Sequence, residues 1–240
     1  MSMKYVRDQT GRLPERPHYE PKELDTLFEN IVSKFLKLRH GIIEFPIATD
    51  DLTVLIERDT KDLDIYADLT SYGPNVEGVT EFHPGQKPTV RISRTVSEAE
   101  NSENRFRTTL THEYGHVHLH GYLFEMNTRG SDLLDQHSKP NVIACKRDTI
   151  ISAPRTDWME WQAGYACGAM LMPASYVRSE IERYRVESKL YGPVPASTPQ
   201  GLNMIDLIVN RFQVSRDAAR VRLSVLGYLG AAPTAGSLPF

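Results

Sequence analysis

The sequence contains few cysteines and no long apolar run, and these absences exclude several classes of protein. Two cysteines in 240 residues are too few for a disulfide framework and favour a reducing compartment. The apolar stretch from Ala169 to Met172 ends at Pro173, far short of the roughly 18 residues that a membrane span needs. The charged start of the chain is not followed by an apolar core, so it does not resemble a signal peptide. We therefore expect a cytoplasmic protein that spans no membrane.

Neither sign of charge dominates the sequence. The 28 basic and 31 acidic side chains give a formal net charge of -3, so any contact with nucleic acid would need a local basic surface. Hydrophobic residues make up 40% of the chain and charged residues 25%, which is ordinary for a folded domain and excludes wholesale disorder.

Hydrophobic periodicity, together with glycine and proline, predicts a mixed α+β fold. Residues 1–21 carry three prolines and few apolar groups, so we expect them to form a flexible arm. Helices are predicted for residues 22–40, 50–58, 102–120, 157–172, 175–185, 202–212 and 216–226. Strands are predicted for residues 63–69, 78–82 and 89–93, the last two as a hairpin-like pair. The predicted division is an arm at 1–21, a main domain at 22–186, a linker at 187–200, a helical module at 201–230 and a tail at 231–240.

Single residues set two of the predicted helix boundaries. Asp50 is the expected N-cap of the second helix, because its carboxylate can accept from a free backbone amide. Gly121 is expected to end the third helix. The stretch 122–156, which follows, shows no steady period.

Four of the eight histidines lie between residues 112 and 120. His112 and His116 are four residues apart, so on a helix their rings share one face, roughly 6 Å apart, and can chelate one metal ion. Glu113 lies about 100° around the same helix, where its carboxylate can accept a proton from metal-bound water. This is the pattern of a zinc peptidase. His118 points away, and His120 lies about 12 Å along the axis from His112, so we expect both to have structural or supporting roles.

A catalytic zinc site needs a third protein ligand besides one open position. The candidates downstream are Glu125, Asp132, Asp135, Asp157, Glu160 and His137. Glu160 heads a helical stripe of small side chains that would let its helix approach the histidine helix, and a carboxylate buried there needs a cation. The alternative is a capping box from Asp157 to Glu160, in which Glu160 binds only a backbone amide. We favour Glu160 as the ligand, and we expect Cys167 on the same stripe to be a buried, inert thiol.

Two segments of the sequence resemble the ImmA/IrrE family of metallopeptidases. They are Arg105-Phe-Arg-Thr-Thr-Leu-Thr-His-Glu-Tyr-Gly-His116, and Glu160-Trp-Gln-Ala163 with the Met170-Leu-Met-Pro173 that ends its helix. The resemblance implies a gluzincin-like core that holds one Zn²⁺, or another divalent ion such as Mn²⁺, through His112, His116 and Glu160. It also implies that Glu113 is the catalytic acid and base. Residues 122–156 are longer than the corresponding family segment, which indicates an insertion that covers the cleft or docks a substrate.

The resemblance also implies a partner and an activity. Members of this family cleave helix-turn-helix repressors, so we expect a zinc endopeptidase whose substrate is such a repressor. Its action would derepress stress or mobile-element genes. For the residue that stabilises the oxyanion, the candidates are Tyr122, Tyr165, Tyr176 and Arg178.

Residues 201–230 themselves resemble a helix-turn-helix, with arginines 216, 220 and 222 on the second helix. We do not favour direct DNA binding, because arginine contacts to phosphate position a protein without reading bases. A packing or substrate-docking role is expected instead. The rival hypothesis for the whole chain is a regulator that binds DNA or a repressor and keeps only a structural or vestigial metal site.

Overall fold

The structure is a computed structural model that describes residues 4–83, 85–100, 102–128, 141–146, 150 and 157–230. The described strands are β1 (Lys4–Arg7), β2 (Glu15–His18), β3 (Asp62–Ala67), β4 (Val76–Phe82), β5 (Thr89–Ser93), β6 (Asn141–Lys146), β7 (Val194–Pro195) and β8 (Leu229–Gly230). The described helices are α1 (Pro21–His40), α2 (Thr49–Asp59), α3 (Arg94–Ser97), α4 (Glu103–Thr128), α6 (Trp158–Leu171), α7 (Ala174–Glu187), α8 (Pro199–Phe212) and α9 (Arg216–Val225), with a 3₁₀ turn at Thr70–Tyr72.

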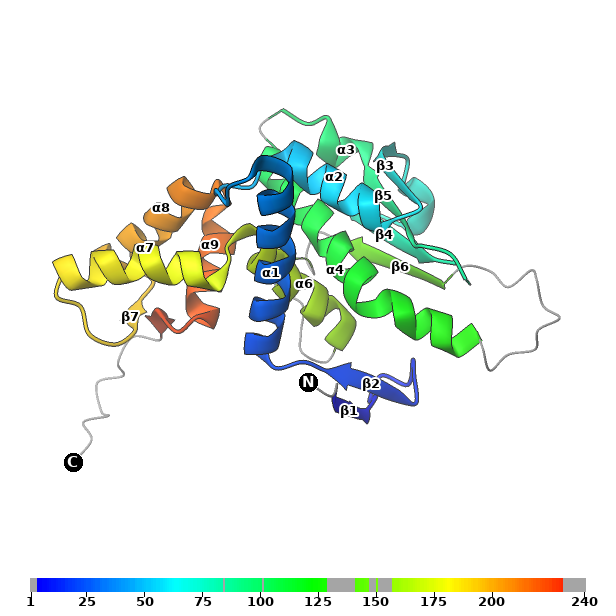
Figure 1. The fold of residues 1–240 in the computed structure, drawn as a ribbon, viewed down its shortest axis with the longest axis horizontal. Helices are drawn as coiled ribbons and strands as arrows, with labels where there is room; N and C mark the ends of the chain where they lie inside the picture. Colours follow the sequence, from blue (N-terminus) through cyan, green and yellow to red (C-terminus); the bar gives the residue numbers. More distant parts are fainter. Residues whose placement is uncertain are drawn as a thin grey trace.

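The predicted α+β class is confirmed. A four-stranded sheet lies toward one end of the molecule, and α7, α8 and α9 lie together toward the other (Figure 1). None of the described helices is long and apolar enough to cross a membrane.

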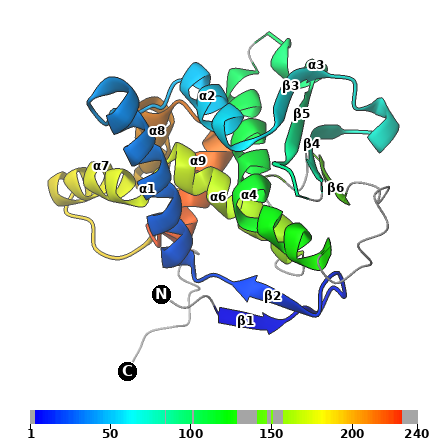
Figure 2. The same cartoon turned by 45° about the vertical axis from the view of Figure 1, so that its right-hand side comes forward.

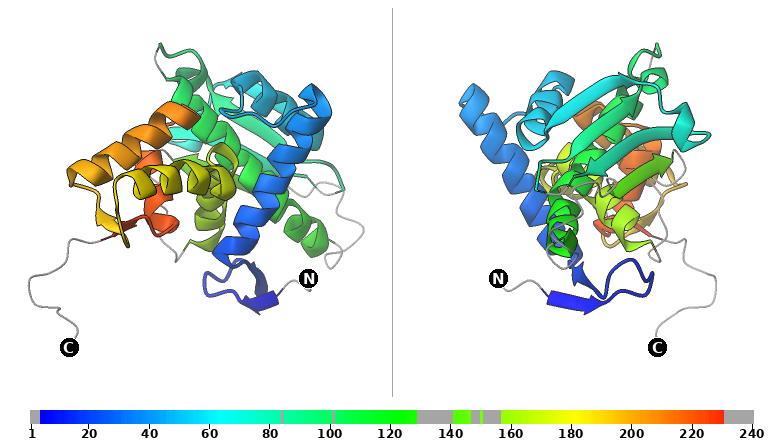
Figure 3. Two further views of the ribbon diagram at one scale, coloured as in Figure 1. Left: turned by 60° about the vertical axis from the view of Figure 1, so that its left-hand side comes forward. Right: turned by 90° about the vertical axis from the view of Figure 1, so that its right-hand side faces the viewer.

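The larger sheet has the strand order β3-β5-β4-β6, and the right panel of Figure 3 looks onto it. β3 and β5 run parallel, whereas β4 runs antiparallel to both of its neighbours, β5 and β6. The three predicted strands and the hairpin-like pairing of β4 with β5 are confirmed. β6 is not among the predicted strands, and it comes from the stretch 122–156, where the sequence shows no steady period.

α4 runs along one face of this sheet, and α6 packs against the side of α4 that faces away from the sheet (Figure 2). The two helices approach closely at Gly115, because a Cβ atom there would lie 2.9 Å from the Cα atom of Ala163. α4 continues to Thr128, so the prediction that it ends at Gly121 is wrong. The helix thus continues through Gly121 despite the roughly 1 kcal/mol that a glycine costs within a helix.

The ends of α1 and α2 show how well local sequence signals predict helix boundaries. α1 ends before Gly41, whose φ of 76° is the left-handed conformation that glycine readily adopts after a helix. α2 differs from its prediction, because its N-cap is Ala48 and Asp50 lies in the first turn. An acidic side chain in the first turn still complements the helix dipole. The helix is therefore predicted correctly although its cap is not.

The first residues form a hairpin instead of the predicted flexible arm. β1 and β2 pair antiparallel. The buried carboxylate of Asp8 accepts a hydrogen bond of 3.0 Å from the indole N–H of Trp158, and Arg12 pairs with Asp157 at 3.0 Å. The prediction is wrong for residues 4–18 because it considered only apolar burial, whereas polar partners around the start of α6 hold this hairpin.

α8 and α9 share one hydrophobic core with α1, α4 and α6. From α4, the buried guanidinium of Arg107 donates to the carbonyl oxygens of Gln213 at 2.7 Å and Ile47 at 2.9 Å. The segment predicted to be a linker carries β7, which pairs with β8. The last helices are therefore packed into the main core.

Arg222 on α9 provides a second buried contact to this core. Its guanidinium is paired with the Asp25 carboxylate of α1 at 2.7 Å and donates to the carbonyl oxygen of Met172 at 2.9 Å. The side chain of Arg222 is 3% exposed and that of Asp25 is 9% exposed. Removing either partner of an ion pair this deeply buried leaves the other charge buried without a counter-ion, which destabilises the folded protein.

Replacing Arg222 by methionine should lower the free energy of unfolding by about 3–5 kcal/mol, because the Asp25 carboxylate loses its cation but stays buried. Urea denaturation of the purified protein measures this change. The matched control is Arg220→Met on the same helix, whose partner Asp217 is exposed and lies 3.4 Å away. The control should change stability by about 0.5 kcal/mol or less. Equal losses in the two variants would contradict the importance of the buried pair.

Candidate metal centre

His112 and His116 of α4 and Glu160 of α6 converge on one point between the two helices. The two Nε2 atoms lie 3.1 Å apart, and they lie 3.2 Å and 3.3 Å from the carboxylate oxygens of Glu160. Two ligands of a tetrahedral zinc ion, with bonds of about 2.0–2.1 Å, are separated by about 3.3 Å. The three donors therefore have the spacing of one triangular face of such a site.

The chemistry of these donors also fits a cation. When the rings are neutral and protonated at Nδ1, both Nε2 atoms present lone pairs to an ion, and the Glu160 carboxylate, 7% exposed, adds negative charge. Burial opposes ionisation of Glu160, but the protons that the Nε2 atoms of His112 and His116 share with it hold the pKa of its carboxyl below its usual range, and a bound ion would take the place of those protons. Because buried charges are paired or coordinate metals, the residues present fit a divalent ion. Two histidines and a glutamate are a donor set that catalytic zinc sites use.

A chain of hydrogen bonds orients the ring of His116 through its Nδ1 atom, on the side away from the metal donors. The amide nitrogen of Gln162 donates to the carbonyl oxygen of Pro17 at 3.2 Å, so its Oε1 faces Nε2 of His120 at 3.1 Å. Burial lowers the pKa of His120 well below its usual value, so the ring is neutral and its Nδ1 accepts once Nε2 donates. Nδ1 of His116, 3.0 Å away, donates to that atom. This leaves the Nε2 lone pair of His116 for the site.

Glu113 lies beside the three donors and faces the sheet. Thr80 of β4 donates from its Oγ1 to Oε2 of Glu113 at 2.6 Å. β4 leaves room for this carboxylate at Gly78, where any Cβ atom would collide with Oε1 of Glu113. Burial raises the pKa of the Glu113 carboxyl to about 7. A carboxyl with that pKa can both accept and release a proton near neutral pH.

The other candidates for a third ligand do not join the cluster. Asp157 makes no capping hydrogen bond through its side chain and pairs with Arg12 instead. The alternative capping box is therefore wrong, and the Glu160 carboxylate faces the histidines. The remaining candidates, Asp132, Asp135 and His137, lie outside the described residues, as does the side chain of Glu125.

The candidates for stabilising an oxyanion have other surroundings. Tyr165 donates to a carboxylate of α1, and the ring of Tyr176 packs against Phe45. Arg178 is exposed on α7, and Tyr122 neighbours tyrosines of the N-terminal segment. None of the contacts described for these side chains is with the metal-donor cluster.

A family model described as the IrrE N-terminal-like domain, Peptidase_M78, matches residues 81–224, which is more than half of the chain. The chain belongs to the ImmA/IrrE family. The resemblance of the two segments is therefore confirmed, and the matched region includes both α4 and α6. A search of curated proteins and a search of solved structures found no match.

Sequence reasoning does not find four residues around this ImmA/IrrE site, which are Gly78, Thr80, Cys145 and Gln162. Gly78 carries a signal, because a glycine within a strand pattern often marks a close approach of another group. For Thr80, Cys145 and Gln162, the sequence alone contains no signal that places them near the site. Which polar side chain of a strand or helix faces the site depends on how the elements pack.

Two glycines of the small-residue stripe on α6, Gly164 and Gly168, contact elements other than α4. Gly164 packs against the backbone of Ile150, and Gly168 lies beside Arg222. The close approach to α4 comes instead from Gly115 on the histidine helix. Cys167 is buried as expected, accepts a hydrogen bond of 3.2 Å from Thr111, and has its pKa raised to about 11 by burial.

Replacing Gln162 by leucine removes the acceptor that orients His120 and, through it, His116. We expect the affinity for zinc to fall about 10–100-fold, the range seen for indirect partners of metal ligands. Competition with a fluorescent chelator measures this affinity. Gln200→Leu, at the exposed start of α8, is the control and should leave it unchanged. A folded Gln162→Leu protein with unaltered affinity would refute the role of the hydrogen-bond chain.

Proposed function

We propose that this protein is a zinc-dependent endopeptidase that cleaves a helix-turn-helix transcriptional repressor and thereby derepresses stress or mobile-element genes. The observation that carries the proposal is the placement of the Glu113 carboxylate beside the three converging donors. Membership of the ImmA/IrrE family supports peptidase activity. The repressor substrate is proposed from the family resemblance.

In this proposal His112, His116 and Glu160 hold the ion. When bound, it supplies Lewis-acid chemistry that makes a water molecule more acidic and a peptide carbonyl more electrophilic. Glu113 accepts the proton of the attacking water and then delivers it to the nitrogen of the leaving amine, so that water and peptide yield a carboxylic acid and an amine. Thr80 orients the Glu113 carboxylate during both transfers.

A cavity of about 450 Å³ beside Glu160 supports an extended peptide as the substrate. Its wall is formed by β6, the start of α6 and the N-terminal hairpin, and it includes charges of both signs from Arg12, Lys146 and Asp157. β6 pairs with β4 along one edge. An extended peptide can add to the other edge of such a strand through main-chain hydrogen bonds.

The contacts of α9 weigh against the rival hypothesis of a DNA reader. Arg222 is buried against Asp25, so it cannot reach a phosphate without unpacking the core. Arg216 pairs with Asp206, and Arg220 with Asp217. These acidic partners reduce the positive charge that the helix presents. We propose that residues 201–230, whose turn lies at Gln213, are a helix-turn-helix-like packing or substrate-docking module.

Replacing Glu113 by glutamine should leave zinc stoichiometry unchanged and slow cleavage of a cognate repressor by about 10²–10⁴-fold, because the amide cannot accept the proton of water. Elemental analysis of the purified variant and gel-based cleavage kinetics measure the two quantities. Glu98→Gln, at an exposed position, is the matched control and should behave as wild type.

The rival hypothesis makes the opposite prediction for the wild-type protein. If zinc-loaded wild type leaves candidate repressors intact while gel shifts show binding to operator DNA, the regulator hypothesis is supported and the peptidase proposal fails.

A further inference from the structure

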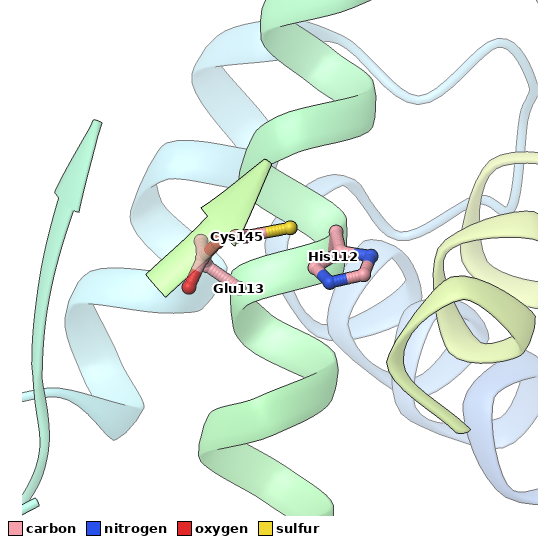
Figure 4. Close-up of side chains that lie close together, drawn as sticks. All are labelled: His112, Glu113 and Cys145. Carbon is pink, nitrogen blue, oxygen red and sulfur yellow. The ribbon is translucent and has the colours of Figure 1, made fainter. Parts of the chain in front are cut away.

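Cys145 on β6 reaches the same corner of the molecule as the three proposed metal ligands. It has no exposed surface, and its Sγ atom lies 3.7 Å from Oε2 of Glu160. Its sulfur, a ring nitrogen of His112 and a carboxylate oxygen of Glu113 all lie within 4.8 Å of one another. Figure 4 shows the sulfur projecting from the strand toward the ring of His112.

The distance to Glu160 fits two ligands of one ion. A zinc–thiolate bond of about 2.3 Å and a zinc–carboxylate bond of about 2.1 Å, at a tetrahedral angle, place sulfur and oxygen about 3.6 Å apart. Thiolate is also among the strongest protein ligands of zinc. Cys145 therefore has the donor type of a fourth ligand, and relative to Glu160 its sulfur has the spacing of one.

The backbone of the sheet directs this side chain to the site. Cys145 is paired with Gly78 of β4, the residue that makes room for Glu113. The register between the strands shifts beside this pair, between Val76 and Gly78. Such bulges re-aim side chains and are frequent beside active sites. Along β6 the neighbours of Cys145, Ala144 and Lys146, are exposed, so Cys145 is the side chain that points inward.

We propose that the Cys145 thiolate is the fourth ligand of the bound metal and that the conformation described here is a latent form of the enzyme. The proposal rests on the zinc-peptidase function proposed above. As sulfur binds the ion, the thiol proton passes to the Glu113 carboxylate or to solvent, and no electrons are transferred. The position that water and a substrate carbonyl need is then occupied.

The accessibility of the site agrees with a closed form. His112, Glu113 and His116 have no exposed surface. The cavity beside β6 is lined by Glu160 and by residues of β6 itself. A substrate in this cavity would therefore meet β6 before it met the histidines. Hydrolysis requires the sulfur of Cys145 to leave the ion.

Cobalt substitution tests the ligand directly, without an activity assay. Co²⁺-loaded wild type should show a sulfur-to-cobalt charge-transfer band in the near ultraviolet in addition to visible d–d bands. Cys145→Ser should keep the d–d bands and lose the charge-transfer band, and Cys167→Ser is the matched control that should retain both. Chelator competition should show at least an approximately tenfold loss of zinc affinity in Cys145→Ser and none in Cys167→Ser.

The outcomes separate this proposal from the proposed function. Visible d–d bands in wild type without a charge-transfer band would overturn the sulfur ligand and leave the peptidase proposal standing. A wild-type protein that binds neither cobalt nor zinc would overturn both. The wild-type spectrum decides the point even if Cys145→Ser does not fold, and Cys145→Ala provides a second variant.

The proposed latent form is tested separately, by the rate of proteolysis. With zinc bound, Cys145→Ser should hydrolyse fluorescently labelled β-casein faster than wild type, whereas Cys167→Ser should match wild type. Wild-type and Cys145→Ser proteins that hydrolyse β-casein at equal rates would overturn the latent form.

Discussion

The convergence of two ring nitrogens and a carboxylate inside the protein constrains everything around it. Three lone-pair donors within hydrogen-bonding distance of one another repel unless a cation or shared protons lie between them. Their closeness depends on Gly115, which lets α6 approach α4, while Gly78 leaves space beside them for Glu113. Glycines on two different elements, α4 and β4, therefore provide the space that this site requires.

The N-terminal hairpin supports the same corner from outside. Its Pro17 carbonyl holds the amide of Gln162, which orients His120 and in turn His116. Asp8 and Arg12 contact the start of α6, the helix that carries Glu160. A segment with little apolar surface thus becomes ordered by polar contacts with the elements that form the metal centre.

The sequence predicted those features that depend on local pattern. The strong apolar stripe of α1 and the alternation in β3 have local causes, and the spacing of His112 and His116 follows from helix geometry. Features with tertiary causes were missed: the continuation of α4 through Gly121, the pairing of β6, and the burial of Arg222. From the sequence alone, an arginine is expected to lie at the surface. Only the packing of the helices shows that Arg222 is buried and which carboxylate pairs with it. Glu160 was favoured as the third ligand because a carboxylate on a stripe of small side chains needs a cation, and the family motif implied the same residue.

The anchoring of Arg107 ties the C-terminal helices to the histidine helix. This side chain leaves the histidine helix about one turn before the metal donors and binds the carbonyl oxygen of Gln213, at the turn between α8 and α9. A chimera that exchanged the C-terminal helices as an independent cassette would have to restore that acceptor inside the core. Without that acceptor, the buried guanidinium of Arg107 would lose its 2.7 Å hydrogen bond and be left partly unsatisfied.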